Sequence, residues 1–103
     1  MEEIIYIYKS NGFYFGFIKN GFLFSRDGIY CGWIERGFVW DEKGHFRGVL
    51  TDNKYILVKR FAIPPISRTP KIAPAKEIPP APPANIAPIA LPPELIDAFN
   101  GNE

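Results

Sequence analysis

The sequence predicts an all-β fold: an antiparallel meander of 16-residue β-hairpin repeats that curls into a shallow pseudo-fourfold barrel, followed by a polyproline II tail and a short C-terminal helix. Two observations carry this prediction. Glycine and aromatic residues recur every 16 residues in the first half of the chain, which indicates a repeated supersecondary unit. All 11 prolines lie at or after Pro64, and 15 of the 16 aromatic residues lie at or before Phe61. Two physically different segments therefore share the chain.

The first half divides into three full repeats and a partial fourth. Residues 6–21 read YIYKSNGFYFGFIKNG, residues 22–37 read FLFSRDGIYCGWIERG, and residues 38–53 read FVWDEKGHFRGVLTDN. In each repeat we predict two strands of about four and about six residues, each followed by a three-residue loop. Residues 54–63 keep an apolar strand but lack the turn glycine. We therefore assign residues 1–63 to the barrel.

Each predicted loop ends in a residue that tolerates a left-handed backbone conformation. Glycine ends the first loop of every full repeat, and glycine or asparagine ends the second: Gly12, Gly28, Gly44, Gly21, Gly37 and Asn53. Such residues close three-residue hairpin loops at low cost. The predicted cross-strand pairs are Tyr8–Tyr14, Tyr6–Gly16 and Ile18–Phe22, with their equivalents in the later repeats. Each strand glycine is then covered by an aromatic ring.

This pairing predicts which side chains share a face. The predicted inner face holds Tyr6, Tyr8, Tyr14, Ile18, Phe22, Phe24, Tyr30, Ile34, Phe38, Trp40, Phe46 and Leu50. The predicted outer face holds Ile7, Phe13, Phe15, Phe17, Leu23, Ile29, Cys31, Trp33, Val39, His45, Arg47 and Val49. The first two repeats give this outer face an apolar surface that should be covered. Four of its rings are candidate ligand-binding residues: Phe13, Phe15, Phe17 and Trp33.

The repeated pattern of aromatic-x-aromatic, a three-residue turn ending in Gly, and x-aromatic-x-Gly-x-Ile resembles the four-fold beta-flower proteins, a small bacterial family of unknown function. The likeness covers residues 4–63. It implies a shallow symmetric barrel of hairpin petals, similar in outline to the tubby C-terminal domain without its central helix, and a proline-rich continuation. It implies no activity. The fourth petal, Lys54–Ile63, departs from the pattern because it lacks the turn glycine.

Residues 64–93 form a proline-rich tail. Proline excludes a helix or a central strand there, so we predict polyproline II, which has three residues per turn. At that period the isoleucines of the tail, from Ile63 to Ile78, fall in one row. We predict that Ile66, Ile72 and Ile78 dock this row on an apolar groove or on the outer aromatic surface. The alternative is a chance alignment in a disordered tail.

We predict a short helix in residues 94–103, after the tail. Proline suits its first turn, and Asn100-Gly101 suits its end. Leu95, Ile96 and Phe99 share one face of this helix. We expect that face to anchor the tail on the barrel. The alternative is a contact with a partner or with a membrane surface.

Composition argues against several functions. With 12 basic and 11 acidic residues, the formal charge is +1, so the chain lacks the basic excess of a nucleic-acid binder. The single cysteine permits no intrachain disulfide. Neither a secretory signal nor a membrane-spanning stretch is recognisable. We therefore expect a cytoplasmic protein, with peripheral membrane contact left open.

The supply of catalytic side chains is small. Cys31 and His45 are the only cysteine and histidine. A thiolate beside an imidazole is a nucleophile pattern, but no third orienting group stands at a recognisable spacing. One Cys and one His are also too few for a structural zinc site. We therefore predict no catalytic residue, no metal and no cofactor.

These observations predict a non-enzymatic binding or scaffold module of unknown role. Its aromatic-rich barrel would engage its own tail, an apolar or lipid ligand, or a protein partner, including a second copy. The tubby-like outline implies a lipid version with basic headgroup contacts: Lys19, Arg26, Arg36, Lys54, Lys59 and Arg60.

Two alternatives use other features. In the first, the chain is a recruitment protein whose tail, through Lys76–Pro82, is the ligand of a partner with an aromatic groove. In the second, it is a choline-binding or cell-wall-binding aromatic repeat, because Gly16-Phe17 and Gly32-Trp33 look similar to the dipeptides of those repeats.

Overall fold

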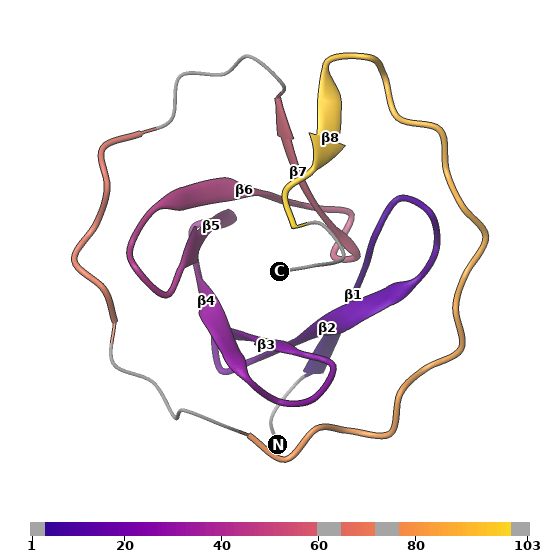
Figure 1. Cartoon of the computed structure of the whole chain (residues 1–103), viewed down its shortest axis with the longest axis horizontal. Coiled ribbons are helices and arrows are strands. Elements are labelled where there is room, and N and C mark those ends of the chain that lie inside the picture. Colours follow the sequence, from indigo (N-terminus) through magenta and orange to yellow (C-terminus); the bar gives the residue numbers. More distant parts are fainter. Residues whose placement is uncertain (1–3, 60–64, 72–76, 100–103) are drawn as a thin grey trace.

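A computed structural model of the chain describes residues 4–59, 65–71 and 77–99. It contains the strands β1 (Ile4–Tyr8), β2 (Tyr14–Lys19), β3 (Phe22–Ser25), β4 (Tyr30–Glu35), β5 (Phe38–Asp41), β6 (Phe46–Thr51), β7 (Tyr55–Lys59) and β8 (Leu95–Asp97). They form one sheet in chain order, with every neighbouring pair antiparallel. The sheet curls into a half-barrel (Figure 1). The prediction of an all-β antiparallel meander is confirmed.

The first loop of each repeat has three residues, as predicted. In the first repeat, the N–H of Lys9 donates to the carbonyl of Phe13 at 2.9 Å, and the loop ends at Gly12 with φ of 91°. Tyr8 then pairs with Tyr14. The same arrangement recurs in the next two repeats, with the pairs Phe24–Tyr30 and Trp40–Phe46. We call each hairpin built on such a loop a petal.

A β-bulge follows each of these aromatic pairs. Beyond Tyr8 and Tyr14 the register shifts by one residue, so Ile7 rather than Tyr6 lies opposite Gly16. The equivalent glycines lie opposite Leu23 and Val39. The predicted cover of each strand glycine by an aromatic ring is therefore wrong, because a bulge inserts an extra residue into one strand and turns later side chains to the other face.

The second loops are shorter than predicted. Asn20 and Gly21 both have positive φ, 55° and 81°, which defines a type I′ turn with two central residues. Ile18 therefore pairs with Leu23, and the predicted pair Ile18–Phe22 is wrong. The next petal has the same turn, so Ile34 pairs with Val39 and not with Phe38.

Bulges and short turns together change which face is inside. The barrel interior is built around Ile7, Ile18, Leu23, Val39, Ile56, Ala98 and Phe99, with Ile5, Phe15, Cys31, Ile34, Leu50 and Val58 packed against them. Ile18, Ile34 and Leu50 are on the predicted inner face. The aromatic residues predicted beside them lie outside, whereas Ile7, Leu23 and Val39, predicted outside, line the core.

The segment after the tail is a strand, so the predicted C-terminal helix is wrong. Leu95 and Ile96 pair with Lys59 and Val58 along the edge of β7, which would otherwise expose unpaired backbone groups. β8 therefore supplies the second strand of the fourth petal, and the whole tail is the loop of that hairpin (Figure 1).

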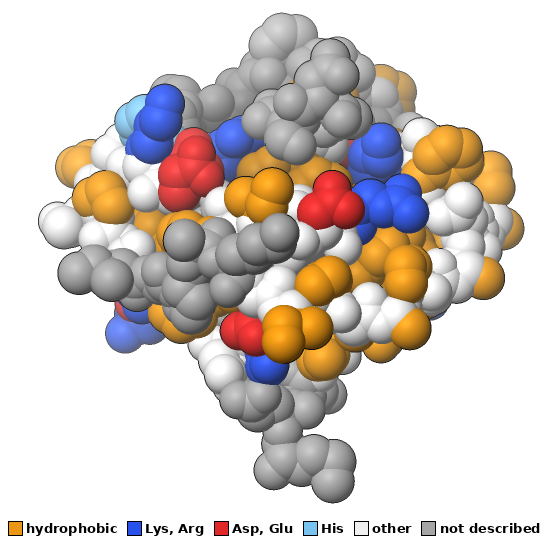
Figure 2. All heavy atoms as spheres, turned by 60° about the horizontal axis from the view of Figure 1, so that its bottom comes forward, with side chains coloured by type: hydrophobic (Ala, Val, Ile, Leu, Met, Phe, Trp, Pro, Cys, Tyr) orange, Lys and Arg blue, Asp and Glu red, His pale blue; other side chains and the backbone are white. Residues whose placement is uncertain are grey.

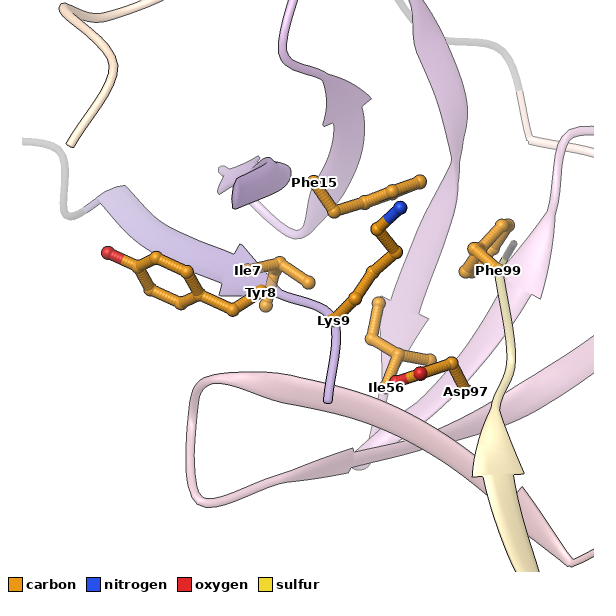
Figure 3. A pocket seen from close by; sticks show the side chains of 7 residues that line it. All are labelled: Ile7, Tyr8, Lys9, Phe15, Ile56, Asp97 and Phe99. Atoms are coloured by element: carbon orange, nitrogen blue, oxygen red, sulfur yellow. The ribbon is translucent and has the colours of Figure 1, made fainter. Parts of the chain in front are cut away.

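Phe99 enters the barrel directly after β8. Its side chain is 5% exposed, and its ring centroid lies 5.2 Å from that of Phe15. Figure 3 shows Phe15, Ile56 and Phe99 around one interior space, while Tyr8 points away from it. The adjacent Asp97 accepts hydrogen bonds from the N–H and Oγ of Ser10 at 2.9 and 2.6 Å. This segment therefore joins the fourth petal to the first.

Candidate functional site

The outer face of the petals carries three groups of contacting rings, which together we call the aromatic belt: Tyr6, Tyr8 and Tyr14; Phe17, Phe22, Phe24 and Tyr30; and Trp33, Phe38, Trp40 and Phe46. Phe17 and Phe24 are directly opposite each other, with ring centroids 5.3 Å apart. The equivalent pair in the next petal is Trp33 and Trp40, 6.3 Å apart. Phe17 is 0% exposed and Trp33 is 1% exposed, although both face away from the barrel core.

The tail contacts part of this belt, including Trp33. Residues 65–71 and 77–93 run around the outside of the sheet, from β7 back to β8 (Figure 1). The guanidinium of Arg68 lies 5.4 Å from the ring centroid of Trp40, and the ammonium of Lys71 lies 5.8 Å from that of Trp33. The Tyr30 hydroxyl donates to the carbonyl of Lys71 at 3.4 Å. The belt and the tail therefore form one contact surface.

Backbone hydrogen bonds join the tail to the first loop of three petals. The N–H groups of Arg68, Glu77 and Ile86 donate at 2.8, 2.7 and 2.9 Å. Their acceptors are the carbonyls of Gly44, Gly28 and Gly12, respectively. The donors are nine residues apart and the acceptors are 16 residues apart. One nine-residue step of the tail therefore matches one petal.

The same three glycines make room for the tail. A Cβ atom at Gly12 would collide with the carbonyl oxygen of Ile86. A Cβ atom at Gly28 or Gly44 would collide in the same way with the carbonyl oxygen of Glu77 or Arg68, respectively. Their φ angles of 85° to 91° also favour glycine. Sequence reasoning found the turn role of these residues and missed the contact role.

The nine-residue step is visible in the sequence. Prolines recur at that interval in two series: Pro70, Pro79 and Pro88, and Pro65, Pro74, Pro83 and Pro92. In a polyproline II segment, nine residues would make three turns and would return the same side of the segment to the barrel. This spacing is the signal from which the contacts with the petals could have been predicted.

The predicted docking row does not face the barrel. Ile66 is 90% exposed and Ile78 is 87% exposed, so both point to solvent; Ile72 lies outside the described residues. Partly buried positions of the tail occur instead at a spacing of three in another row: Glu77, Pro80, Pro83 and Ile86. The glycine carbonyls select this row, because residues 77 and 86 are the ones whose N–H groups they bind.

Two ion-pair sites lie along the belt. In the second petal, Glu35 Oε1 lies 3.0 Å from Arg68 Nη2 and 4.0 Å from Lys71 Nζ. In the first petal, Lys19 Nζ lies 3.3 Å from Glu77 Oε1. Desolvation alone would raise the pKa of the Glu35 carboxyl, but the hydrogen bond and charge of Arg68, with the charge of Lys71, hold it below its usual value.

Tyr14 lies where the tail crosses the first petal. Its N–H donates to Asn85 Oδ1 at 3.0 Å. Its hydroxyl is buried and has no hydrogen-bond partner among the described residues. Desolvation by burial, reinforced by the neighbouring Tyr6, raises the pKa of Tyr14 to about 12.

The four predicted ligand-binding rings do not form one surface. Phe17 and Trp33 belong to the belt under the tail. Phe13 is 57% exposed at the end of the first loop, and Phe15 points inward against Phe99 because it is the bulge residue. Among the residues predicted to dock the tail, Leu95 and Ile96 are half-buried in β8.

Cys31 and His45 border one hollow of about 270 Å³, together with Asp41, Arg47 and Phe99. Cys31 Sγ lies 3.4 Å from the carbonyl oxygen of Ile29. His45 Nδ1 lies 3.8 Å from Asp41 Oδ2. In the part of the chain that the structure describes, no group of three or more metal-ligating side chains comes together.

The basic residues predicted for lipid contact are scattered. Lys19 pairs with Glu77, and the Arg26 guanidinium lies 5.9 Å from the Tyr14 ring centroid. Arg36, Lys54 and Lys59 are exposed, whereas Arg60 lies outside the described residues. On the face seen in Figure 2, acidic and basic side chains adjoin one another. No helix able to span a membrane occurs in residues 4–59, 65–71 or 77–99.

The window predicted for recruitment is partly engaged by the barrel. Glu77 contacts Lys19, and Pro80 is half-buried. Ile78, Pro79 and Pro82 are exposed. Lys76 lies outside the described residues.

A family model described as 4-fold beta flower protein matches residues 1–99. This description names a shape and no catalytic activity. The match spans the petals, the tail and β8. No curated protein and no solved structure matches the chain.

Proposed function

The chain belongs to the four-fold beta flower family, and we propose that it is a non-enzymatic binding module whose aromatic belt holds a polyproline II segment, with its own tail as the resident ligand. Aromatic-lined grooves are a recurring means of binding such segments, which lose little conformational entropy because they are already extended. This function uses the belt and the tail as two halves of one interaction.

One observation carries this proposal: the hydrogen bonds from Arg68, Glu77 and Ile86 to the petal glycines. Proline has no N–H, so 19 of the 30 residues from 64 to 93 carry a backbone donor. Three of these donors lie at the nine-residue interval at which a polyproline II strand would present the same side to successive petals. A tail that served only as a spacer would have no need of this match.

Hydrogen–deuterium exchange of the full chain, followed residue by residue by NMR, tests the proposal. We expect slow exchange at the amides of Arg68, Glu77 and Ile86. The residues that follow them, Thr69, Ile78 and Ala87, provide internal controls, because no hydrogen bond from their N–H groups occurs in the described residues. Those amides should exchange fast. Equal rates within each pair of neighbours would overturn the proposal.

A further inference from the structure

Lys19 and Glu35 occupy equivalent places in the first two petals. Each is the last residue of a petal's second strand, β2 or β4, and the two are 16 residues apart. Each contacts a charged residue of the tail, and these partners, Glu77 and Arg68, are nine residues apart. The same contact is therefore made twice, with the charges reversed.

Backbone contacts alone do not distinguish one nine-residue step of the tail from the next. Each of the first three petals offers a glycine carbonyl, and each step of the tail that meets them offers an N–H donor and the same proline spacing. The charges do distinguish the steps. A shift by one step would place Glu77 against Glu35 or Arg68 against Lys19, so either shift would bring like charges together.

The belt rings strengthen this discrimination. Arg68 and Lys71 each lie near Glu35 and near a tryptophan ring, Trp40 or Trp33. A cation is attracted by both groups, whereas an acidic residue would be repelled by the carboxylate and by the negative face of the ring. The side chains of Lys19 and Glu77 are 23% and 26% exposed, so solvent screens their pair only in part.

We propose that Glu35 and Lys19 are specificity-determining residues of the belt. They select a polyproline II segment with a basic residue on the second petal and an acidic residue nine positions later on the first, and they set its register. This inference rests on the proposed function, since it names the ligand class that the belt accepts. The tail meets the rule with Arg68 and Glu77, and Lys71 adds a second cation at Glu35.

A charge-exchange experiment on the full chain tests the inference. All variants carry Lys71→Gln, so that the second cation does not obscure the result. The barrel variant adds Lys19→Glu and Glu35→Lys, and the tail variant adds Arg68→Glu and Glu77→Lys. The combined variant carries all four exchanges. The two substitutions added on each side cancel, so the net charge of the Lys71→Gln parent is preserved.

We expect amide exchange at positions 68 and 77 to accelerate about fivefold in the barrel variant and in the tail variant. In the combined variant, the exchange rates should return to those of the Lys71→Gln parent. In 1 M salt the difference should largely disappear. Exchanging the charges of Glu42 and Lys43 is the matched control. Both are exposed, and neither forms an ion pair with the described part of the tail, so this pair should have no effect.

The outcomes separate the inference from the proposed function. The charge rule would be overturned by unchanged exchange rates in the barrel and tail variants, or by a combined variant whose rates do not return to those of the parent. Protected amides in the unmodified chain would still support the proposed function of the belt. Unprotected amides at positions 68, 77 and 86 in the unmodified chain would overturn both.

Discussion

Gly12 and Ile86 meet backbone to backbone. The N–H of Ile86 donates to the carbonyl of Gly12 at 2.9 Å, and the carbonyl oxygen of Ile86 lies where a side chain at position 12 would begin. The loop and the tail therefore constrain each other's sequence at this point. The same relationship links Gly28 to Glu77, which allows the contact to be tested apart from the turn.

Gly28→Ala should destabilise the protein more than Gly37→Ala. Both glycines have positive φ, 85° and 84°, so both substitutions strain the backbone by about 1–2 kcal/mol. Only Gly28 has the tail carbonyl of Glu77 in the way, whereas no atom lies within 4 Å of the Cβ position at Gly37. We expect an additional loss of about 1–3 kcal/mol for Gly28→Ala in urea unfolding. Equal losses would contradict the contact.

Phe99→Ala should strongly lower the free energy of unfolding. Phe99 is 5% exposed inside the barrel, and removing a buried phenylalanine costs about 3–5 kcal/mol. Phe13→Ala is the control, because Phe13 is 57% exposed and should lose about 0.5 kcal/mol or less. Denaturant titration of both variants measures the difference. Similar small losses would show that Phe99 is not the core residue described above.

Stability should fall in alkaline solution through Tyr14. Its pKa rises from the ordinary 10.0 to about 12 in the folded protein because burial disfavours the phenolate. An acid whose pKa is raised on folding contributes its full stability below the unfolded pKa and loses it as the pH rises toward the folded value. Tyr14→Phe should therefore flatten the dependence of Tm on pH between 10 and 12. An unchanged slope would count against the burial of this hydroxyl.

Native mass spectrometry of the full-length chain should show a monomer near 11.7 kDa. We expect this because the belt of each chain already holds its own tail, and β8 returns to β7 of the same chain. A dimer that dissociates only on unfolding would indicate that two copies exchange tails. Retained mass of lipid size would favour an apolar ligand instead.

The repeat of 16 was enough to predict the meander, the first loops and the Tyr8–Tyr14 pair. It was not enough to predict the faces, because the extra residue of each repeat could be placed in the second loop or in a strand. Both choices keep equivalent side chains on one face. The structure places it at the bulge residue Phe15 and closes the second loop with the type I′ turn Asn20-Gly21, a dipeptide typical of that turn.

The tail and β8 could be predicted less well, because their positions depend on distant partners. The period of three was visible, but the glycine carbonyls decide that the row containing Glu77 faces inward and the row containing Ile78 faces outward. In the same way, Leu95–Asp97 has no strong local preference between helix and strand. Residues 95–97 form a strand because they pair with the open edge of β7. This edge can be located only after the fold is known.

The insertion of the tail into the fourth petal has a consequence during synthesis on the ribosome. The first three petals leave the exit tunnel before the tail, and β8 and Phe99 follow later still. Until then the tryptophans and the edge of β7 are uncovered on the nascent chain, and such surfaces associate readily with other chains. The surfaces that β8 and Phe99 cover are therefore the ones exposed longest during synthesis.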